Sequence, residues 1–296
     1  MQFGFKKNSS CNSALFTFTE SVKFCNSYGF KLWCAFLDAS KAFDKVLHNG
    51  LSVKLLNRQV PVCFVRLLRN WYSRLSGLVR WNGLTGDLFS ISCGVRQGSV
   101  LSPFLFAIYI DGLISDLRQS GYGLYIGRLF LGCIAYADDI ALLSVSFFGM
   151  QKLLDICAKY GSLWDIKFNP GKSQLIYFGP SVKTSSTLCL SGSVIETVDK
   201  VKYLGVYFEK SSGLSNISQT FVKFYSQFNT IMSVLGKRSQ ELTALHLVKT
   251  YCLSTLLFGC EIWTLSAQSV HRLNVAWNNC FRHIFGEFRM KSAKSL

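Results

Sequence analysis

The chain has 296 residues, of which 49% are hydrophobic and only 4 are proline, so its composition excludes a disordered chain. Lys and Arg number 32 against 16 acids, and the net charge of +16 favours a polyanionic partner such as nucleic acid over plain surface solvation. The longest uncharged stretch, residues 97–110, is too short to span a bilayer. The 11 cysteines form no C-x-x-C pair, which indicates reduced thiols in an intracellular protein.

Apolar spacing and turn residues predict the elements of the first part of the chain. The aromatic-rich run LWCAFLD is a strand candidate that ends on Asp38. Pro61 suits a first helical turn and separates two helical stretches. In chain order we expect a helix at 12–28, a strand at 32–38, helices at 49–58 and 61–75, a β-hairpin at 77–94 and a long helix at 102–118.

The second part of the chain begins with strands and ends in helices. The polar stretch EKSSGLSN at 209–216 predicts a boundary between two regions. Beyond about residue 215 the pattern is helical and basic, with nine Lys or Arg against three Glu between Lys223 and Leu296. Before that boundary we expect strands at 122–126, 130–136 and 140–145, a helix at 148–163, a turn and strand at 168–179, and strands at 186–190 and 201–208.

Two adjacent acids, Asp138 and Asp139, stand inside the apolar run CIAYADDIALL. Taken alone, they are compatible with a solvated turn, for which Asp is well suited. Together with Asp38 at the end of another strand, they form a set of hard oxygen ligands of the kind that Mg²⁺ prefers. Two such ions can bind the attacking and leaving oxygens in phosphoryl transfer. The acids therefore predict either a turn or a metal site.

Six sequence segments favour the metal site over the solvated turn, because together they resemble the motifs of a known enzyme family. They resemble the reverse transcriptases of non-LTR (LINE-type) retrotransposons over about residues 2–210, and their joint occurrence makes the likeness specific. The segments are QFGFKKNSSCNSAL (2–15), AFLDASKAFDKV (35–46), GVRQGSVLSPFLFAIYIDGL (94–113), YADD (136–139), FNPGKSQLIYF (168–178) and VKYLGVYF (201–208).

The resemblance implies an α+β right-hand polymerase fold. Residues 1–31 would be partial fingers, 32–209 a palm with an antiparallel sheet and embedded finger elements, and 210–296 a short, basic helical thumb. The likeness begins within the family's finger segment, so we expect the chain to be part of a longer polyprotein or a decayed copy. Without the upstream finger strands, we expect it to bind primer–template and extend it poorly.

The resemblance also implies the catalytic roles. Asp38, Asp138 and Asp139 would hold two Mg²⁺ ions, for which Mn²⁺ is a possible substitute. Lys172 would protonate the leaving pyrophosphate. Alternatively, it is a solvated lysine that follows a turn and has no catalytic role. Asp44 is the closest rival of Asp38, and its other interpretation is a charge in the first turn of a helix.

The nucleotide and primer contacts are implied in the same way. Phe43 would lie beneath the sugar and select deoxynucleotides, because its ring collides with a 2′-hydroxyl. Ala39 would contribute its backbone carbonyl, and Leu204 with Gly205 would form the primer grip. The remaining nucleotide-binding candidates follow the predicted hairpin: Arg96, Gln97 and Gly98.

The function implied is RNA-directed DNA polymerisation in target-primed retrotransposition. RNA template, DNA primer and deoxynucleoside triphosphates would be the partners, with no membrane. One alternative is a catalytically silent remnant that binds nucleic acid without extending a primer. A cyclase or nuclease with a related palm is a poorer alternative, because Gln97 and Gly98 would then have no purpose.

Overall fold

The computed structural model describes residues 1–180, 187–210, 217–236, 240–263 and 266–286. The chain divides into two compact units, Met1–Leu204 and Gly205–Leu296. The division falls a few residues before the boundary that the polar stretch 209–216 predicts. The assignment of these parts to fingers, palm and thumb stays a prediction.

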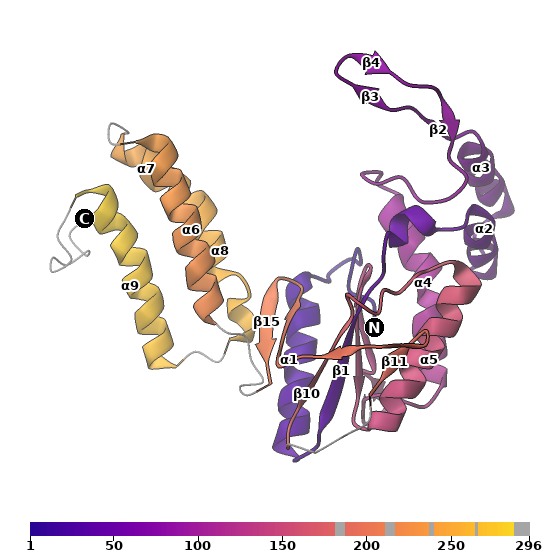
Figure 1. The fold of residues 1–296 in the computed structure, drawn as a ribbon, viewed down its shortest axis with the longest axis horizontal. Coiled ribbons are helices and arrows are strands. Elements are labelled where there is room, and N and C mark those ends of the chain that lie inside the picture. Colours follow the sequence, from indigo (N-terminus) through magenta and orange to yellow (C-terminus); the bar gives the residue numbers. More distant parts are fainter. Residues whose placement is uncertain (181–186, 211–216, 237–239, 264–265, 287–296) are drawn as a thin grey trace. The chain divides into compact units, whose positions relative to one another are not determined.

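A five-stranded sheet forms the centre of the first unit (Figure 1). Its central strand β1 runs antiparallel to its neighbours β9 and β10. Six of the seven residues of β1 are buried, and this explains why the sequence shows a continuous apolar run instead of alternation. In spatial order the strands are β13 (Glu196–Thr197), β10 (Gln174–Phe178), β1 (Leu32–Asp38), β9 (Asp139–Ser144) and β8 (Cys133–Tyr136).

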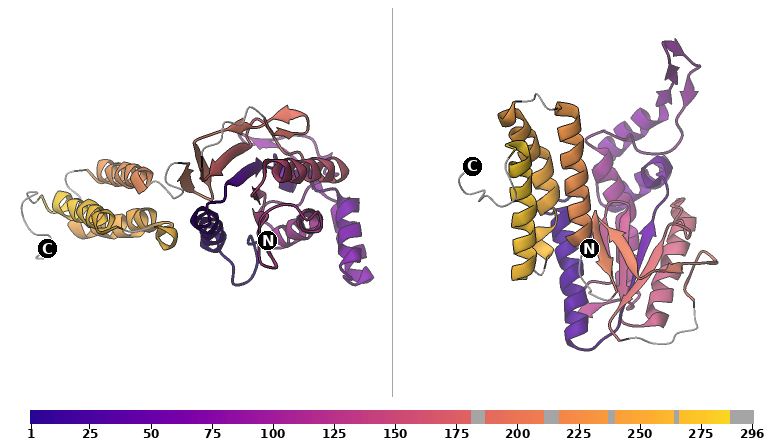
Figure 2. Two further views of the ribbon diagram at one scale, coloured as in Figure 1. Left: turned by 90° about the horizontal axis from the view of Figure 1, so that it is seen from below. Right: turned by 60° about the vertical axis from the view of Figure 1, so that its left-hand side comes forward.

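Helices cover both faces of this sheet (Figure 2). Trp33 and other alternate residues of β1 belong to the main core, together with residues of α4 (Ser102–Gln119) and α5 (Phe147–Trp164). On the other face Phe36 contacts Phe18 of α1 (Cys11–Ser27), with ring centroids 5.5 Å apart. The predicted helices at 12–28, 102–118 and 148–163 are therefore confirmed, and each buries a face against the sheet.

The chain between β1 and α4 forms a short 3₁₀ turn, two helices and a hairpin. Pro61 separates the two helices, as predicted, and is the residue directly before the second one instead of part of its first turn. At the hairpin tip Asn82 and Gly83 have φ of +47° and +84°, the left-handed backbone that a tight hairpin turn needs. These elements are η1 (Ala42–Lys45), α2 (His48–Asn57), α3 (Val62–Ser73), and the paired strands β2 (Ser76–Gly77) with β5 (Phe89–Ser90) and β3 (Arg80–Trp81) with β4 (Leu84–Thr85).

Several predicted strands are shorter in the structure than the sequence indicated. The strand expected at 130–136 is divided, because its first residue pairs in a separate hairpin and the sheet strand begins only at Cys133. Of the strand expected at 186–190, residue 186 lies outside the described residues. The short strands are β6 (Tyr125–Ile126), β7 (Leu129–Phe130), β11 (Cys189–Leu190), β12 (Ser193–Val194) and β14 (Lys200–Tyr203).

The prediction of one strand over 201–208 is wrong. Leu204 and Gly205 have φ of +44° and +85°, so the extended backbone is interrupted there. β14 ends before these two residues, and β15 (Val206–Glu209) begins after them.

The described part of the second unit is helical beyond β15, as the sequence predicted. Its core is small and consists of residues from α6, η2, α8 and α9, whose bounds are given below. Those residues are Phe224, Phe228, Val248, Cys252, Leu256, Ala276 and Cys280. The elements are α6 (Ile217–Leu235), α7 (Glu241–Leu247), the π-helical segment η2 (Val248–Cys252), α8 (Leu253–Leu257), η3 (Cys260–Ile262) and α9 (Ala267–Ile284).

The segment Glu241–Ile262 is long and apolar enough to cross a membrane by length and composition. This is weak evidence for a span, because the core helix of a soluble bundle passes the same test. Val248, Cys252 and Leu256 of this segment belong to the core shared with α6 and α9. The absence of a membrane partner stays a prediction.

Candidate functional site

The three predicted metal ligands meet at one end of the central sheet. Asp38 is the last residue of β1 and stands opposite Asp139, the first residue of β9. Tyr136 pairs with Asp139 across the β8–β9 hairpin, so only Ala137 and Asp138 form the connecting loop. The strand register therefore places Asp38 opposite Asp139, and Asp138 in the loop directly precedes Asp139.

The backbone at Ala137 is strained, and its surroundings hold it in place. Its φ of +58° is unusual for a residue with a Cβ, and a conformation of this kind costs on the order of 1–3 kcal/mol. Ala137 is buried, and a Cβ at Gly4 would lie only 2.6 Å from its backbone nitrogen. Phe3 also donates its backbone N–H to the Ala135 carbonyl at 2.8 Å. The amino-terminal segment therefore braces the hairpin that carries the acids.

Burial and the neighbouring carboxylates disfavour the charged form of Asp139. Partial desolvation, then the nearby carboxylates of Asp138 and Asp38, raise the pKa of Asp139 above its ordinary value. Among the described residues, no Lys, Arg or His forms an ion pair with these carboxylates. The site therefore carries negative charge that the described side chains leave uncompensated.

Hydrogen bonds from a neighbouring loop fix the end of β1. The N–H of Asp38 donates to Ser173 Oγ at 3.2 Å, and Ser173 Oγ donates to the Asn169 carbonyl at 2.7 Å. The N–H of Asn169 in turn donates to the Asp38 carbonyl at 2.9 Å. Ser40 Oγ donates to Asp38 Oδ2 at 3.2 Å. The two serines were not among the predicted site residues, although Ser173 follows directly after Lys172.

The structure places Lys172 in this supporting loop with its side chain exposed. Its backbone N–H donates to the Asn169 carbonyl at 3.2 Å and anchors the residue in this loop. Ala39, the next residue after Asp38, is buried and forms a bridge with Phe168 of the same segment. Ala39 therefore adjoins Asp38 in the chain, whereas Lys172 belongs to the loop that is hydrogen-bonded to the backbone of Asp38.

Phe43 lies between two other phenylalanines. Its ring stacks on that of Phe106 with centroids 4.4 Å apart, and the ring of Phe5 approaches edge-on at 6.5 Å. The Phe43 carbonyl accepts the N–H of Val95 at 2.8 Å. Packing on one ring face and a backbone anchor fix the position of this side chain.

A cavity of about 630 Å³ lies next to this anchor, between η1 and the hairpin. Arg96 and Gln97 line it together with Asp44, whose Oδ1 accepts a hydrogen bond from Gln97 Nε2 at 3.0 Å. Asp44 lies in the first turn of η1, as expected. Gly98 has a φ of +82° and open space on its Cβ side, so a ligand can approach its backbone closely.

The predicted primer-grip residues lie where the two units join along the chain. Cys11 Sγ donates to the Leu204 carbonyl across 3.8 Å, and a Cβ at Gly205 would lie 3.0 Å from the ring of Phe258. The role of Leu204 and Gly205 stays a prediction.

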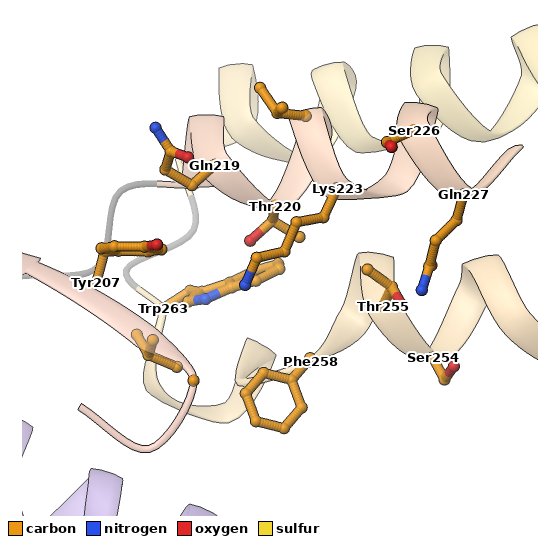
Figure 3. A pocket seen from close by; sticks show the side chains of 13 residues that line it. Tyr207, Gln219, Thr220, Lys223, Ser226, Gln227, Ser254, Thr255, Phe258 and Trp263 are labelled. Atoms are coloured by element: carbon orange, nitrogen blue, oxygen red, sulfur yellow. The ribbon is translucent and has the colours of Figure 1, made fainter. Parts of the chain in front are cut away.

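The second unit has a cavity of its own, of about 600 Å³ (Figure 3). In it Lys223 extends from α6 toward Trp263, and its Nζ lies 5.6 Å from the ring centroid of Tyr207. Phe258 lines the same cavity, as do the polar side chains of Gln219, Thr220, Ser226, Gln227, Ser254 and Thr255. Aromatic rings beside an ammonium group provide the chemistry that binds stacked bases and phosphates.

The first unit thus carries three carboxylates at one end of an antiparallel sheet and a separate cavity beside η1. The family model "Reverse transcriptase (RNA-dependent DNA polymerase)" matches residues 1–208, and the chain belongs to this family. The predicted resemblance is therefore confirmed.

The curated relatives come from mobile elements. A "Probable RNA-directed DNA polymerase from transposon BS" of Drosophila melanogaster is 28% identical over 96% of this chain and 32% of that protein. The "RNA-directed DNA polymerase from mobile element jockey" of Drosophila funebris is 25% identical over 85% of the chain and 28% of its own length. The polyprotein of retrotransposable element R2DM is 30% identical over 60% of the chain and 17% of its length. The chain thus spans about a third or less of these relatives.

The fold resembles that of a solved telomerase. The apo telomerase of Candida tropicalis, truncated from its C-terminal domain, matches with a TM-score of 0.51 at 15% identity. The match covers 71% of this chain and 39% of the telomerase chain. The predicted α+β polymerase fold is confirmed by this likeness.

Proposed function

We propose that this chain contains the catalytic centre of an RNA-directed DNA polymerase of a non-LTR retrotransposon. The observation that carries the proposal is the register of β1 against β9, which puts Asp38 opposite Asp139 with Asp138 in the adjoining two-residue loop. Membership of the reverse transcriptase family supports the choice of reaction.

The acids fit magnesium by their chemistry. Within the described residues, no three His, Cys, Asp or Glu side chains form a ready-made metal cage. Mg²⁺ does not require one, because it is usually bound by one or two carboxylates together with waters and substrate phosphates. The raised pKa of Asp139 also indicates carboxylates that a cation would stabilise. Asp38, Asp138 and Asp139 would hold two Mg²⁺ ions, or Mn²⁺ in their place.

Bound metal would lower the pKa of the primer 3′-hydroxyl and neutralise charge on the triphosphate. The protein's own groups then position the substrates. Phe43, fixed against Phe106, would exclude a 2′-hydroxyl and so favour deoxynucleotides. Lys172 would donate a proton to the leaving pyrophosphate, from the loop that anchors the backbone of Asp38.

The remaining candidates would bind the nucleotide by polar contacts. Arg96 and Gln97 face the cavity beside η1, and the backbone of Gly98 is open to close approach. Ala39 would contribute its backbone carbonyl next to the acids. These groups offer both donors and acceptors to a deoxynucleoside triphosphate.

Nucleic acid would be held mainly by charge. The net charge of +16 suits an RNA template and a DNA primer. Contacts to backbone phosphates give affinity without recognising the base sequence. In the second unit, the cavity with Lys223 and Trp263 would contact the strand backbone and bases. Leu204 and Gly205 would form the primer grip.

Primer extension tests the proposal. The chain is incubated with a labelled DNA primer on an RNA template, deoxynucleotides and Mg²⁺, and template-directed extension is expected. Binding of primer–template with no extension, in either Mg²⁺ or Mn²⁺, would instead identify a silent nucleic-acid-binding remnant. That alternative deserves the test because the chain spans only about a third of the first relative's length.

A further inference from the structure

The segment that carries Phe43 and Asp44 is joined to the loop before α4 by several backbone hydrogen bonds. The N–H of Gly94 donates to the Val46 carbonyl at 2.8 Å, and Leu47 forms a bridge with Cys93. Gly94 has a φ of +92°, and a Cβ there would lie 2.8 Å from the Asp44 carbonyl oxygen. The backbones of the two segments are therefore in close contact, with little freedom to shift.

One side-chain hydrogen bond completes this junction. Gln97 Nε2 donates to Asp44 Oδ1 at 3.0 Å, although the two residues are 53 positions apart in the sequence. Both side chains are exposed and line the same cavity of about 630 Å³. The contact is therefore part of a cavity wall instead of a buried core.

The chemistry of this pair determines which way the glutamine amide faces. A glutamine amide has a donor end and an acceptor end of nearly the same shape, whereas an ionised carboxylate only accepts hydrogen bonds. Gln97 must therefore present its NH₂ group to Asp44. Its carbonyl oxygen Oε1 is left available to a partner in the cavity.

We infer that Asp44 is a positioning residue, which fixes the amide of Gln97 so that Oε1 accepts a hydrogen bond from the sugar or base of the incoming deoxynucleotide. This inference rests on the proposed polymerase function. It goes beyond the expected role of Asp44 as a charge in the first turn of a helix. By this route an acid outside the metal site would affect nucleotide binding without touching the reacting atoms.

Asp44→Asn is the sharpest variant, because an amide of the same size is satisfied by either orientation of Gln97. We expect the KM for deoxynucleotide to rise about fivefold, with kcat within about twofold of the parent value. Gln97→Ala should raise KM at least as much. In the Gln97→Ala background, Asp44→Asn should have no further effect, because the group it positions is gone.

A matched control lies on α5, where Gln151 Nε2 donates to the carboxylate of Asp155 at 2.8 Å. Asp155→Asn removes a carboxylate from a similar exposed pair away from the cavity, and it should leave KM unchanged. Circular dichroism melting of all variants verifies that they are folded.

Two results would overturn the inference: an unchanged KM in Asp44→Asn, or effects of the two substitutions that multiply in the double variant. A parent chain that extends no primer would count against the proposed function alone. The same variants are then compared by retention of labelled deoxynucleotide on a dideoxy-terminated primer–template with Mg²⁺. A loss on Asp44→Asn that disappears in the Gln97→Ala background would support the inference, and equal retention would overturn it.

Discussion

At the acid end of the first unit, the backbone of Asp38 is held by hydrogen bonds to Asn169 and Ser173, and its carboxylate faces Asp139 across the sheet. The cavity of the second unit is different: Lys223, Gln219 and Gln227 project from α6 and line a cavity whose wall also contains aromatic rings. The first arrangement depends on the identity and position of single side chains. The second cavity offers a positive charge and aromatic rings to a nucleic acid strand. Such contacts depend less on the exact position of any one side chain. Substitutions should therefore have large, specific effects in the first unit and small, graded effects in the second.

The largest effect is expected for Asp138→Asn. Loss of one anionic ligand should reduce primer extension on the order of 10³-fold or more, while the fold is retained because the side chain is exposed. Single-turnover extension rates measure this, with Asp155→Asn as the folded control. Asp44→Asn should reduce extension far less than Asp138→Asn, and the opposite ranking would mean that the wrong aspartate had been assigned to the metal.

The next effect in size concerns salt, and it tests the second unit. Binding to primer–template should weaken on the order of tenfold or more between about 50 and 200 mM salt, because phosphate contacts release counterions. Lys223→Ala should reduce the slope of log K against log salt by about one, and Lys152→Ala on α5 should leave it unchanged. Fluorescence anisotropy titrations give these slopes. A flat salt response would contradict the proposed electrostatic role of the second unit.

Phe43→Val should admit ribonucleotides, because removing the ring opens space beside the 2′ position. The ratio of kcat/KM for deoxynucleotide over ribonucleotide is expected to fall on the order of tenfold. Phe148→Val provides a control, since Phe148 is an exposed phenylalanine on α5, 62% accessible. If Phe43→Val leaves the ratio at the parent value, then Phe43 serves only to pack against Phe106.

The smallest effect is a gain in stability from Asp139→Asn. Its pKa is raised in the folded chain, so without divalent metal the folded state should lose stability as the pH rises from about 3.8 through that raised pKa. At neutral pH the variant should melt about 1–3 °C higher than the parent, since it removes repulsion at a partly solvated site. Addition of Mg²⁺ should raise the melting temperature of the parent more than that of the variant. Equal responses to Mg²⁺ would argue against metal binding by this acid.

The family, the class of fold and most of the helices and strands could be predicted from the amino-acid sequence. Local patterns predicted the strand ending at Asp38, the separation of two helices at Pro61 and a hairpin within residues 77–94, because apolar runs and turn residues act within a few positions. The interruption at Leu204–Gly205 was missed, since a leucine with positive φ has no signal in the sequence.

Tertiary structure alone decided how the site is held together. The bond from Asp38 to Ser173 spans 135 positions, and the bond from Gln97 to Asp44 spans 53. Gly4 packs against the strained turn at Ala137, although the two are far apart in the chain. Each of these contacts depends on the register of the strands and the path of the loops, which follow from packing the whole core. For this reason the motifs could name the acids of the site, and only the folded chain could show which neighbours hold them in place.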